Sequence, residues 1–188
     1  ETQLRMLQAQ IEPHFLFNTL ANVMSLIEKE PRSAKNMLQH LTRSLRLSLQ
    51  RSREHESTLE QEATMLRDYL SIFKMRLGTR LDFAIEIPDE LLKLPFPPML
   101  LQPLVENAIK HGIEPKVDGG VVAIKAEKSD GRLRLSVSDT GLGFCNKIND
   151  QGLGIENVKA RLQALYSVNA GLILEENTPS GVTAIIEV

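Results

Sequence analysis

Residues 104–112 read Leu-Val-Glu-Asn-Ala-Ile-Lys-His-Gly and form the end of a helix predicted over Met99–His111. A proline-rich segment precedes this helix, and the glycine that closes the stretch is expected to end it. Asn107, Lys110 and His111 stand at i, i+3 and i+4, so their side chains share one face. An amide oxygen there can complete the shell of Mg²⁺, and the two basic groups can meet phosphate charge. A capped, solvated helix end explains the same residues equally well.

Strands are predicted on both sides of this helix. Alternating apolar residues from Leu81 to Ile87 indicate a half-buried strand before it. After it, two strands meet at a Ser-Asp-Gly hairpin turn, a helix follows the glycine-rich loop, and two further strands end the chain. These elements are predicted over Val121–Glu127, Arg132–Asp139, Ile155–Ser167, Leu172–Glu175 and Val182–Val188. Mostly antiparallel strands with interspersed helices predict an α+β fold, a two-layer α/β sandwich.

Asp139 ends a strand in which Leu133, Leu135 and Val137 alternate, so its carboxylate falls on the buried side. A carboxylate at that position costs free energy unless a group donates to it, and the exocyclic amino group of adenine is a suitable donor. Residues 140–143, Thr-Gly-Leu-Gly, allow the backbone to approach a planar base closely. An ordinary turn at the end of a strand is the alternative interpretation.

A second glycine pair, Gly152 and Gly154, stands where a helix is predicted to begin. Free N–H groups and the helix dipole favour phosphate there. The third spaced glycine of a dinucleotide fingerprint is missing, so that class of site is disfavoured. The polar segment between Gly143 and Gly152 has the composition of a lid that orders over a nucleotide.

The first part of the chain, up to about Leu77, is predicted to be helical. One apolar stripe ends at Ile11 and a second contains Leu16, Leu20, Val23 and Ile27. The five-residue step between them places the second stripe roughly opposite the first. The second stripe is therefore predicted to be buried.

Pro13 removes a backbone donor within this helical stretch, so a bend is expected at the point where His14 is presented. His14 falls near the edge of the first stripe, away from the face that the second stripe buries. We therefore expect the imidazole to face solvent.

Two more helices are predicted in this part of the chain. One begins near Pro31 and buries Met37 or Leu38 together with Leu41, Leu45 and Leu49. The other begins with a capping box, Ser57 with Glu60, and ends at Gly78. Its apolar residues form a heptad seam over Leu59–Leu77. Because such helices have little core of their own, we expect a bundle completed by a second chain, with an intramolecular bundle as the alternative.

Composition excludes several classes of protein. The chain has 188 residues, a net charge of -2 and no long basic run, so no nucleic acid partner is expected. The single cysteine and four scattered histidines indicate neither a disulfide framework nor a zinc site. No apolar run is long enough to cross a bilayer. The chain starts at Glu1 in helical register and is expected to be the soluble part of a longer protein. His40 and His55 are read as surface or packing residues.

Together the later segments resemble the ATP-binding domain of gyrase, heat-shock chaperones, histidine kinases and MutL, the GHKL superfamily with its Bergerat-type fold. Residues 104–112 look like its N box, 139–143 like its first glycine box and 152–155 like its second. Residues 181–183, Gly-Val-Thr, resemble the terminal segment whose threonine supports the adenine pocket. The resemblance implies bound ATP with Mg²⁺, with Asn107 on the metal. It assigns nucleotide binding to Asn107, Lys110, His111, Asp139, Gly141, Gly143, Gly152, Gly154 and Thr183.

Residues 10–18, Gln-Ile-Glu-Pro-His-Phe-Leu-Phe-Asn, are similar to the phosphoacceptor signature of LytS/YehU-type sensor histidine kinases. Residues 66–76 resemble the second dimerisation helix of that family, and the resemblance covers essentially the whole chain. It implies a helical dimerisation and phosphotransfer domain over 1–78 and an ATP-binding domain over 79–188. It also implies a homodimer, held at the cytoplasmic face of the bacterial membrane through a missing N-terminal region.

The implied reaction transfers the γ-phosphate of ATP to His14 and then to an aspartate in the receiver domain of a response regulator. Phe15 stands where many histidine kinases carry an acidic residue, so the general base stays open. Glu106 could serve from the ATP side, whereas Glu12 points to another helix face. Asn18, at i+4 from His14, could orient a water that hydrolyses the phosphorylated regulator.

Two other functions compete with this one. A GHKL ATPase clamp gives no role to an exposed Pro-His pair. A catalytically silent nucleotide-binding adaptor would be expected to lack Asn107 and Asp139, and both are present. The stimulus, the cognate regulator and the choice between cis and trans phosphorylation are not encoded in these residues.

Overall fold

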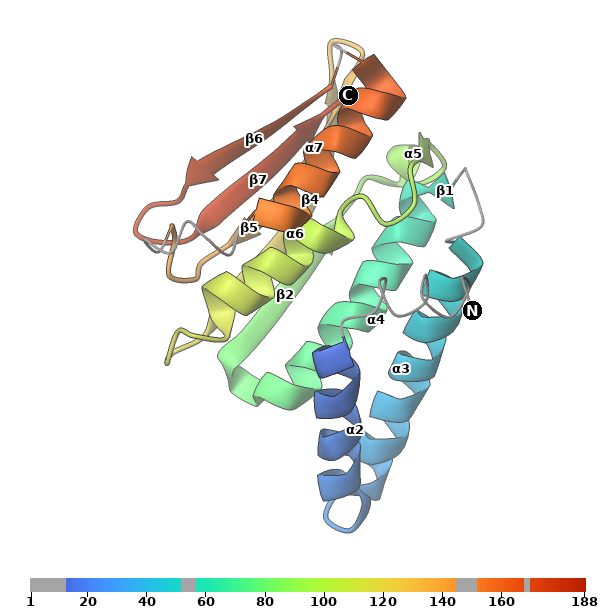
Figure 1. Cartoon of the computed structure of the whole chain (residues 1–188), viewed down its shortest axis with the longest axis vertical. Coiled ribbons are helices and arrows are strands. Elements are labelled where there is room, and N and C mark those ends of the chain that lie inside the picture. Colours follow the sequence, from blue (N-terminus) through green and yellow to red (C-terminus); the bar gives the residue numbers. More distant parts are fainter. Residues whose placement is uncertain (1–12, 52–56, 145–151, 168–169) are drawn as a thin grey trace.

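The computed structural model describes residues 13–51, 57–144, 152–167 and 170–188. Three long helices come first, and a five-stranded sheet with helices on one face follows (Figure 1). Helix α2 (Pro13–Ile27) and helix α3 (Pro31–Arg51) run antiparallel as a hairpin. Helix α4 (Leu59–Leu77) lies between this hairpin and the sheet.

Helix α2 buries a different face from the one predicted. Phe15, Thr19 and Val23 are buried, and of the predicted stripe only Val23 is among them. Leu16 is half-buried, while Leu20 and Ile27 are exposed. The physical reason is an aromatic cluster: the Phe15 ring lies 5.2 Å from the ring of Tyr69 and 5.3 Å from that of Phe73, both on α4. That contact sets the rotation of α2 about its own axis.

The opposite face of α2 carries an exposed apolar stripe. Phe17 is 70% exposed and Met24 is 72% exposed, and Leu20 and Ile27 lie on the same side of the helix. Their spacing of three and four residues is that of a helix face built to meet another helix. We refer to these four residues as the α2 stripe.

Helix α4 is buried on nearly all sides within its own chain. Ten of its residues are buried, including the predicted seam residues Leu59, Ala63, Leu66, Leu70 and Phe73. The predicted burial is confirmed for these five, whereas Leu77 at the end of the seam is half-buried, and the seam packs inside this chain. The N-cap is Thr58, whose hydroxyl accepts from Gln61 N, and not the predicted Ser57, which pairs with Phe96 in a short sheet. Gly78 ends the helix as predicted, at φ 60°.

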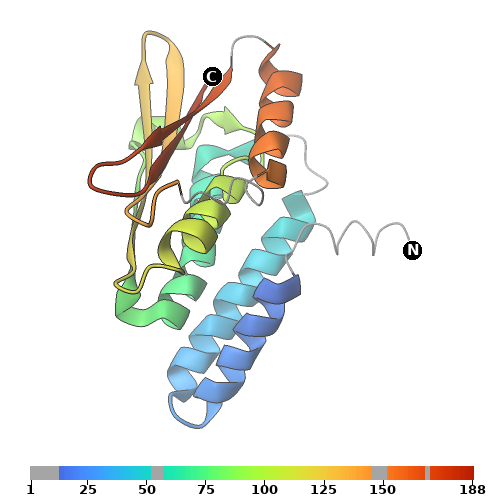
Figure 2. The same ribbon diagram turned by 60° about the vertical axis from the view of Figure 1, so that its left-hand side comes forward.

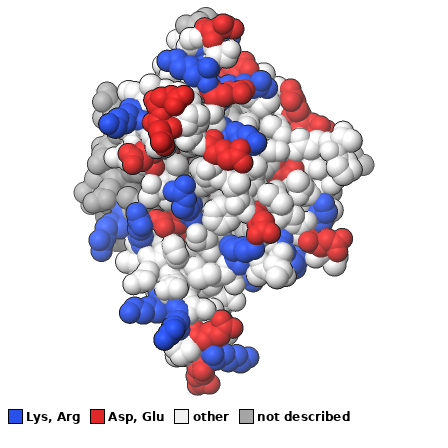
Figure 3. All heavy atoms as spheres, turned by 180° about the vertical axis from the view of Figure 1, so that it is seen from behind, with Lys and Arg blue, Asp and Glu red and all other residues white. Residues whose placement is uncertain are grey.

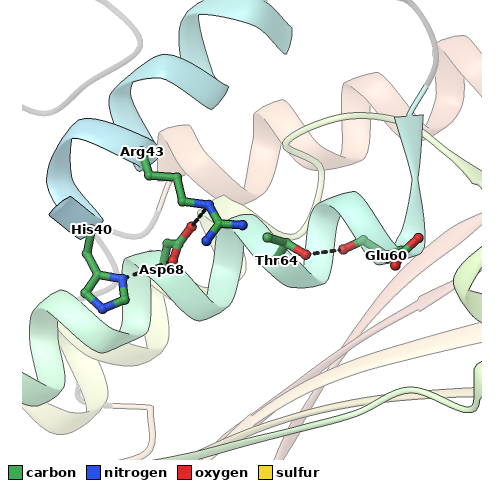
Figure 4. A network of polar contacts seen from close by, with 5 residues as sticks. All are labelled: His40, Arg43, Glu60, Thr64 and Asp68. Carbon is green, nitrogen blue, oxygen red and sulfur yellow. Dashed lines mark hydrogen bonds and ion pairs between the residues drawn. The ribbon is translucent and has the colours of Figure 1, made fainter.

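A polar contact joins α3 to α4 (Figure 4). His40 Nδ1 lies 3.0 Å from Asp68 Oδ1, and Arg43 Nε lies 3.0 Å from Asp68 Oδ2. Asp68 Oδ2 has no hydrogen-bond partner among the described residues. The contact with Arg43 is therefore an ion pair without the angle of a hydrogen bond. His40 thus has a buried acidic partner that the sequence did not reveal, since the two residues are 28 positions apart.

The sheet has the order β2-β4-β5-β7-β6, and only the β2–β4 pair is parallel. The strands are β2 (Leu81–Glu86), β4 (Gly120–Ser129), β5 (Arg132–Asp139), β6 (Gly171–Glu176) and β7 (Val182–Glu187). Helices α4, α6 (Gln102–Asn107) and α7 (Gly152–Tyr166) lie on one side of it (Figure 2). Strands β1 (Ser57–Thr58) and β3 (Pro95–Phe96), helix α5 (Asp89–Leu92) and turn η1 (Gly78–Arg80) complete the connections. The predicted α+β two-layer fold is confirmed.

The helix predicted over Met99–His111 begins and ends later than expected. Met99 has φ 57°, and α6 starts only at Gln102. The buried carboxylate of Glu62 accepts from Met99 N at 2.9 Å and Leu101 N at 3.1 Å, which holds this non-helical entry. Gly112 does not end the helix but lies inside a π-helical turn, η2 (Ala108–Ile113).

Charge is unevenly distributed over the surface. Helix α3 carries five basic residues and no acidic one. Basic side chains gather on the lower left of the face shown in Figure 3, the side on which α3 lies. Within the described residues, no helix is long and apolar enough to cross a membrane.

Candidate active site

A cavity lies between the α6–η2 helix, strands β5 and β7, and the start of α7. It contains about 510 Å³ of space free of protein atoms, part of it open to solvent. Its walls are mainly apolar, and its polar groups come from Asn107, His111 and Asp139. A mostly apolar cavity with a few converging polar groups is the usual form of a small-molecule site.

Asp139 is the buried carboxylate of this cavity, as its place at the end of an alternating strand predicted. It is 4% exposed, and its Oδ1 accepts from Gly141 N at 2.8 Å. Burial raises the pKa of Asp139 above its ordinary value, while hydrogen bonds from the Gly141 and Val182 backbones and the charge of Lys116 act in the opposite direction. The carboxylate therefore retains capacity for a donor from a ligand.

Three glycines let the backbone close tightly around Asp139. A Cβ on Gly112 would lie 2.7 Å from Asp139 Oδ1, and one on Gly141 would lie 2.3 Å from the Gly112 main chain. Gly143 has φ 79°, a conformation that favours glycine, and it lines the cavity. Gly143 and Gly112 thus line the cavity, whereas Gly141 lies behind its wall and contacts Asp139 and Gly112.

The α6–η2 helix contributes Asn107 and His111 to the wall, whereas Lys110 is exposed and is not part of it. The widened π turn explains the difference, because it aligns residues four apart better than residues three apart. Asn107 Nδ2 is buried without a hydrogen-bond partner among the described residues. An unpaired buried amide facing a cavity is a group that a ligand can satisfy.

The second glycine pair lies at the start of α7. Gly152 is the first residue of the helix, and a Cβ on Gly154 would lie 3.7 Å from Asn107 Nδ2. The beginning of α7 therefore comes close to the Asn107 amide, as expected for a phosphate end of the site. The remainder of the predicted lid, residues 145–151, lies outside the described residues.

Thr183 does not line the cavity. Its hydroxyl donates to Asn177 Oδ1 at 2.7 Å and lies 2.8 Å from Ser138 Oγ. Asn177 Nδ2 in turn donates to the main-chain oxygen of Asp139 at 2.8 Å. Thr183 thus contacts the site indirectly, through Ser138 and through Asn177, a residue that carried no motif and that sequence reasoning missed.

The proposed phosphotransfer residues lie on other elements. His14 is the second residue of α2, and its side chain, with the predicted bend before Pro13, lies outside what the structure describes. Asn18 is half-buried on the same helix. Glu106 is half-buried on α6 and accepts from Gln102 Nε2 at 2.7 Å. Neither Glu106 nor Asn18 belongs to the cavity wall.

Comparison with known proteins gives a consistent result. The family model described as "Histidine kinase" matches residues 2–81. The sensor histidine kinase YpdA of Escherichia coli is 35% identical over 175 residues, which cover 88% of this chain and 31% of YpdA. The sensor histidine kinase/phosphatase LytS of Staphylococcus aureus is 32% identical over 196 residues, which cover 97% of this chain and 33% of LytS. The chain thus spans about a third of the length of these curated relatives.

Solved structures show the same fold at low sequence identity. The histidine kinase domain of a blue-light activated kinase from Erythrobacter litoralis has a TM-score of 0.56 and 20% identity, covering 100% of this chain and 93% of that one. The catalytic domain of histidine kinase ThkA has a TM-score of 0.52 and 19% identity, and the match covers 71% of this chain and 94% of the ThkA domain.

Proposed function

The chain belongs to the histidine kinase family, among the sensor kinases of LytS type, and we propose that it carries their ATP-dependent autophosphorylation. In this proposal the γ-phosphate of ATP passes to His14 and then to an aspartate in a response regulator receiver domain. The observation that carries the proposal is the cavity in which a buried carboxylate, Asp139, faces apolar walls.

Each part of the cavity suits one part of ATP with Mg²⁺. The adenine amino group can donate to Asp139, and the apolar walls can cover the faces of the base. Asn107, next to the start of α7, is the residue that would hold Mg²⁺, an ion that keeps most of its waters and takes phosphate oxygens. Mg²⁺ supplies neutralisation of phosphate charge during transfer.

Phosphoryl transfer requires positioning more than covalent help from protein groups. A neutral ring nitrogen of His14 attacks the γ-phosphorus, the bond to the β–γ bridging oxygen breaks, and ADP leaves. The proton on the other ring nitrogen passes to a base. We assign that role to Glu106, whose carboxylate is oriented by the Gln102 amide.

A homodimer is part of this proposal. The α2 stripe exposes four large apolar residues along one helix face, at spacing of three and four residues. A contiguous apolar surface of this kind marks a protein interaction site. A second copy of the same helix offers the same surface, so the two copies are self-complementary. Residues 1–78 would form the dimerisation and phosphotransfer unit, and residues 79–188 the ATP-binding unit.

Two further assignments rest on relatives. A relative is named a histidine kinase/phosphatase, and Asn18, one turn from His14, would orient water for hydrolysis of the phosphorylated regulator. The sensing region and the attachment to the cytoplasmic face of the membrane would lie in parts of a longer protein. The ATPase clamp and the silent adaptor remain the alternatives that the experiment below tests.

The test is incubation of the chain with γ-labelled ATP and Mg²⁺. We expect acid-labile, base-stable label on the protein, its loss in His14→Ala and its retention in His55→Ala. Label that survives His14→Ala overturns the acceptor assignment. ATP turnover without labelled protein would support the clamp, and ATP binding without either would support the adaptor.

A further inference from the structure

Lys116 is a half-buried lysine in the turn that follows η2, and its ammonium group meets three oxygens from two other segments. Its Nζ donates to the main-chain oxygen of Thr140, and it lies 3.5 Å from the main-chain oxygen of Gly141 and 3.3 Å from Ser180 Oγ. A lysine ammonium has three donors, so these three acceptors satisfy it. The segments that it joins are 24 and 64 residues away.

The turn that carries Lys116 is fixed by hydrogen bonds from the Arg80 side chain. Arg80 Nη2 donates to the main-chain oxygens of Glu114 at 2.9 Å and Lys116 at 2.8 Å, and its Nε donates to Val117 O at 3.0 Å. A rigid guanidinium with three backbone contacts fixes the path of this turn. Lys116 therefore projects from a fixed support.

Two of the three oxygens that Lys116 contacts belong to the residues directly after Asp139, Thr140 and Gly141. Gly141 also donates its N–H to the Asp139 carboxylate, so its position decides where that carboxylate points. Leu142 N donates to Gly112 O at 3.2 Å, which fastens the same segment to η2. The ammonium is thus one of the contacts that set the base-binding end of the cavity.

We propose that Lys116 is a positioning residue of the nucleotide site, which aligns the Thr140–Gly141 segment so that the Asp139 carboxylate meets the base. The inference rests on the proposed function and names a residue that does not line the cavity. The lysine acts through the Asp139 side chain and does not itself contact the nucleotide.

The charge of Lys116 gives this role a measurable signature. It opposes the rise in the pKa of Asp139 that burial causes, so it keeps more of the carboxylate ionised. The other titratable groups near Asp139 in the described residues are His111 on the cavity wall and Glu176, close to Gly143. Removing Lys116 should raise the pKa of Asp139 and move the acid limit of nucleotide binding to higher pH.

The experiment measures the dissociation constant for Mg²⁺-ATP by calorimetry between acid and neutral pH. Loss of charge-assisted hydrogen bonds in Lys116→Met should weaken binding at neutral pH by about tenfold. The acid limit of binding should also rise. Lys116→Arg, which keeps charge and donors, should restore most of the affinity. Lys128→Met, at an exposed lysine of β4, is the matched control and should bind as the unmodified chain does.

Binding in Lys116→Met that equals the unmodified chain at every pH overturns the inference. So does a uniform loss with an unmoved acid limit and no rescue by arginine, because that result indicates general loosening. If Lys116→Met fails to fold by circular dichroism, Ser180→Ala tests the same contact, and unchanged affinity there counts against the inference. Failure of the unmodified chain to bind Mg²⁺-ATP instead overturns the proposed function.

Discussion

At the scale of single residues, Asp139 shows a conflict between stability and function. Its pKa in the folded chain is raised above the ordinary 3.8, with burial as the largest cause. The folded state therefore binds this proton more tightly than the unfolded state does. The resulting stabilisation is complete below the unfolded-state pKa and is lost as pH rises through the folded-state pKa. At neutral pH the buried, ionised carboxylate lowers the free energy of unfolding.

Asp139→Asn should separate the two properties. The amide oxygen can still accept from Gly141 N, so the melting temperature should stay unchanged or rise by roughly 2–4 °C for each kcal/mol of relieved burial cost. Mg²⁺-ATP binding should be lost, because the charged acceptor for the base is gone. Calorimetry and thermal unfolding measure both quantities, with the exposed Asp118→Asn as control. Retained affinity in Asp139→Asn would remove the proposed adenine contact.

Local patterns predicted Asp139 because a two-residue period places a residue on one face of a strand. The same reasoning could not reach Lys116 or Asn177. Lys116 meets Ser180 across 64 residues, and Asn177 reaches Asp139 across 38. No local spacing encodes contacts of that range. Lys110 does not line the cavity, and the π turn that contains it is not visible in the periodicity either.

At the scale of elements, α2 has two apolar faces and the sequence did not reveal which one its own chain uses. The deciding contact is Phe15 against Tyr69 and Phe73, some 54 and 58 positions away along the printed sequence. That choice leaves the α2 stripe uncovered. Element ends were similarly off by one to three residues, as at Thr58 and Gln102, because a cap is decided by which side chain meets a free N–H.

Phe17→Glu should break the proposed dimer. A charge placed within an apolar helix–helix contact loses its hydration, so the dimer dissociation constant should rise by at least about tenfold. Analytical ultracentrifugation over a concentration series measures it. Leu165→Glu, at a 53% exposed leucine of α7, is the control and should leave the dimer intact. A Phe17→Glu chain that stays dimeric would show that the α2 stripe is not the interface.

At the scale of the whole molecule, a line of contacts joins helix α2 to the α6–η2 helix. Phe15 stacks on Phe73, the Arg76 guanidinium lies 4.3 Å from the Phe73 ring centroid, and Arg76 forms an ion pair with Glu114. Glu114 directly follows η2 and donates its N–H to Ile109 O at 2.9 Å. Helix α4 is therefore the element through which the two halves of the chain are mechanically connected.

Arg76→Ala should destabilise the chain by about 1–3 kcal/mol, because it removes a half-buried ion pair and a cation–π contact together. Lys74→Ala is the matched control on the same helix. Its pair with Asp82 is exposed and should be worth only about 0.5 kcal/mol. Urea unfolding measures both variants. If both variants lose the same free energy of unfolding, the contacts of Arg76 contribute no more to stability than an exposed ion pair does.

The overall architecture was predictable because strand and helix periods differ clearly in the second half of the chain. The packing partner of α4 was not predictable from the sequence. A heptad seam reads the same whether its partner is a second chain or the sheet of its own chain, and α4 packs within its own chain. The division at residue 78 stays a prediction, since residues of α4 belong to the same core as the sheet.

The two outermost strands of the sheet, β2 and β6, each carry two exposed carboxylates, Asp82 with Glu86 and Glu175 with Glu176. The two carboxylates of β2 pair with Lys74 and Lys125. Charged side chains along both edges discourage fibril-like growth, in which the sheets of neighbouring copies would join edge to edge. Association between copies is thereby directed towards the helices, where the α2 stripe is exposed.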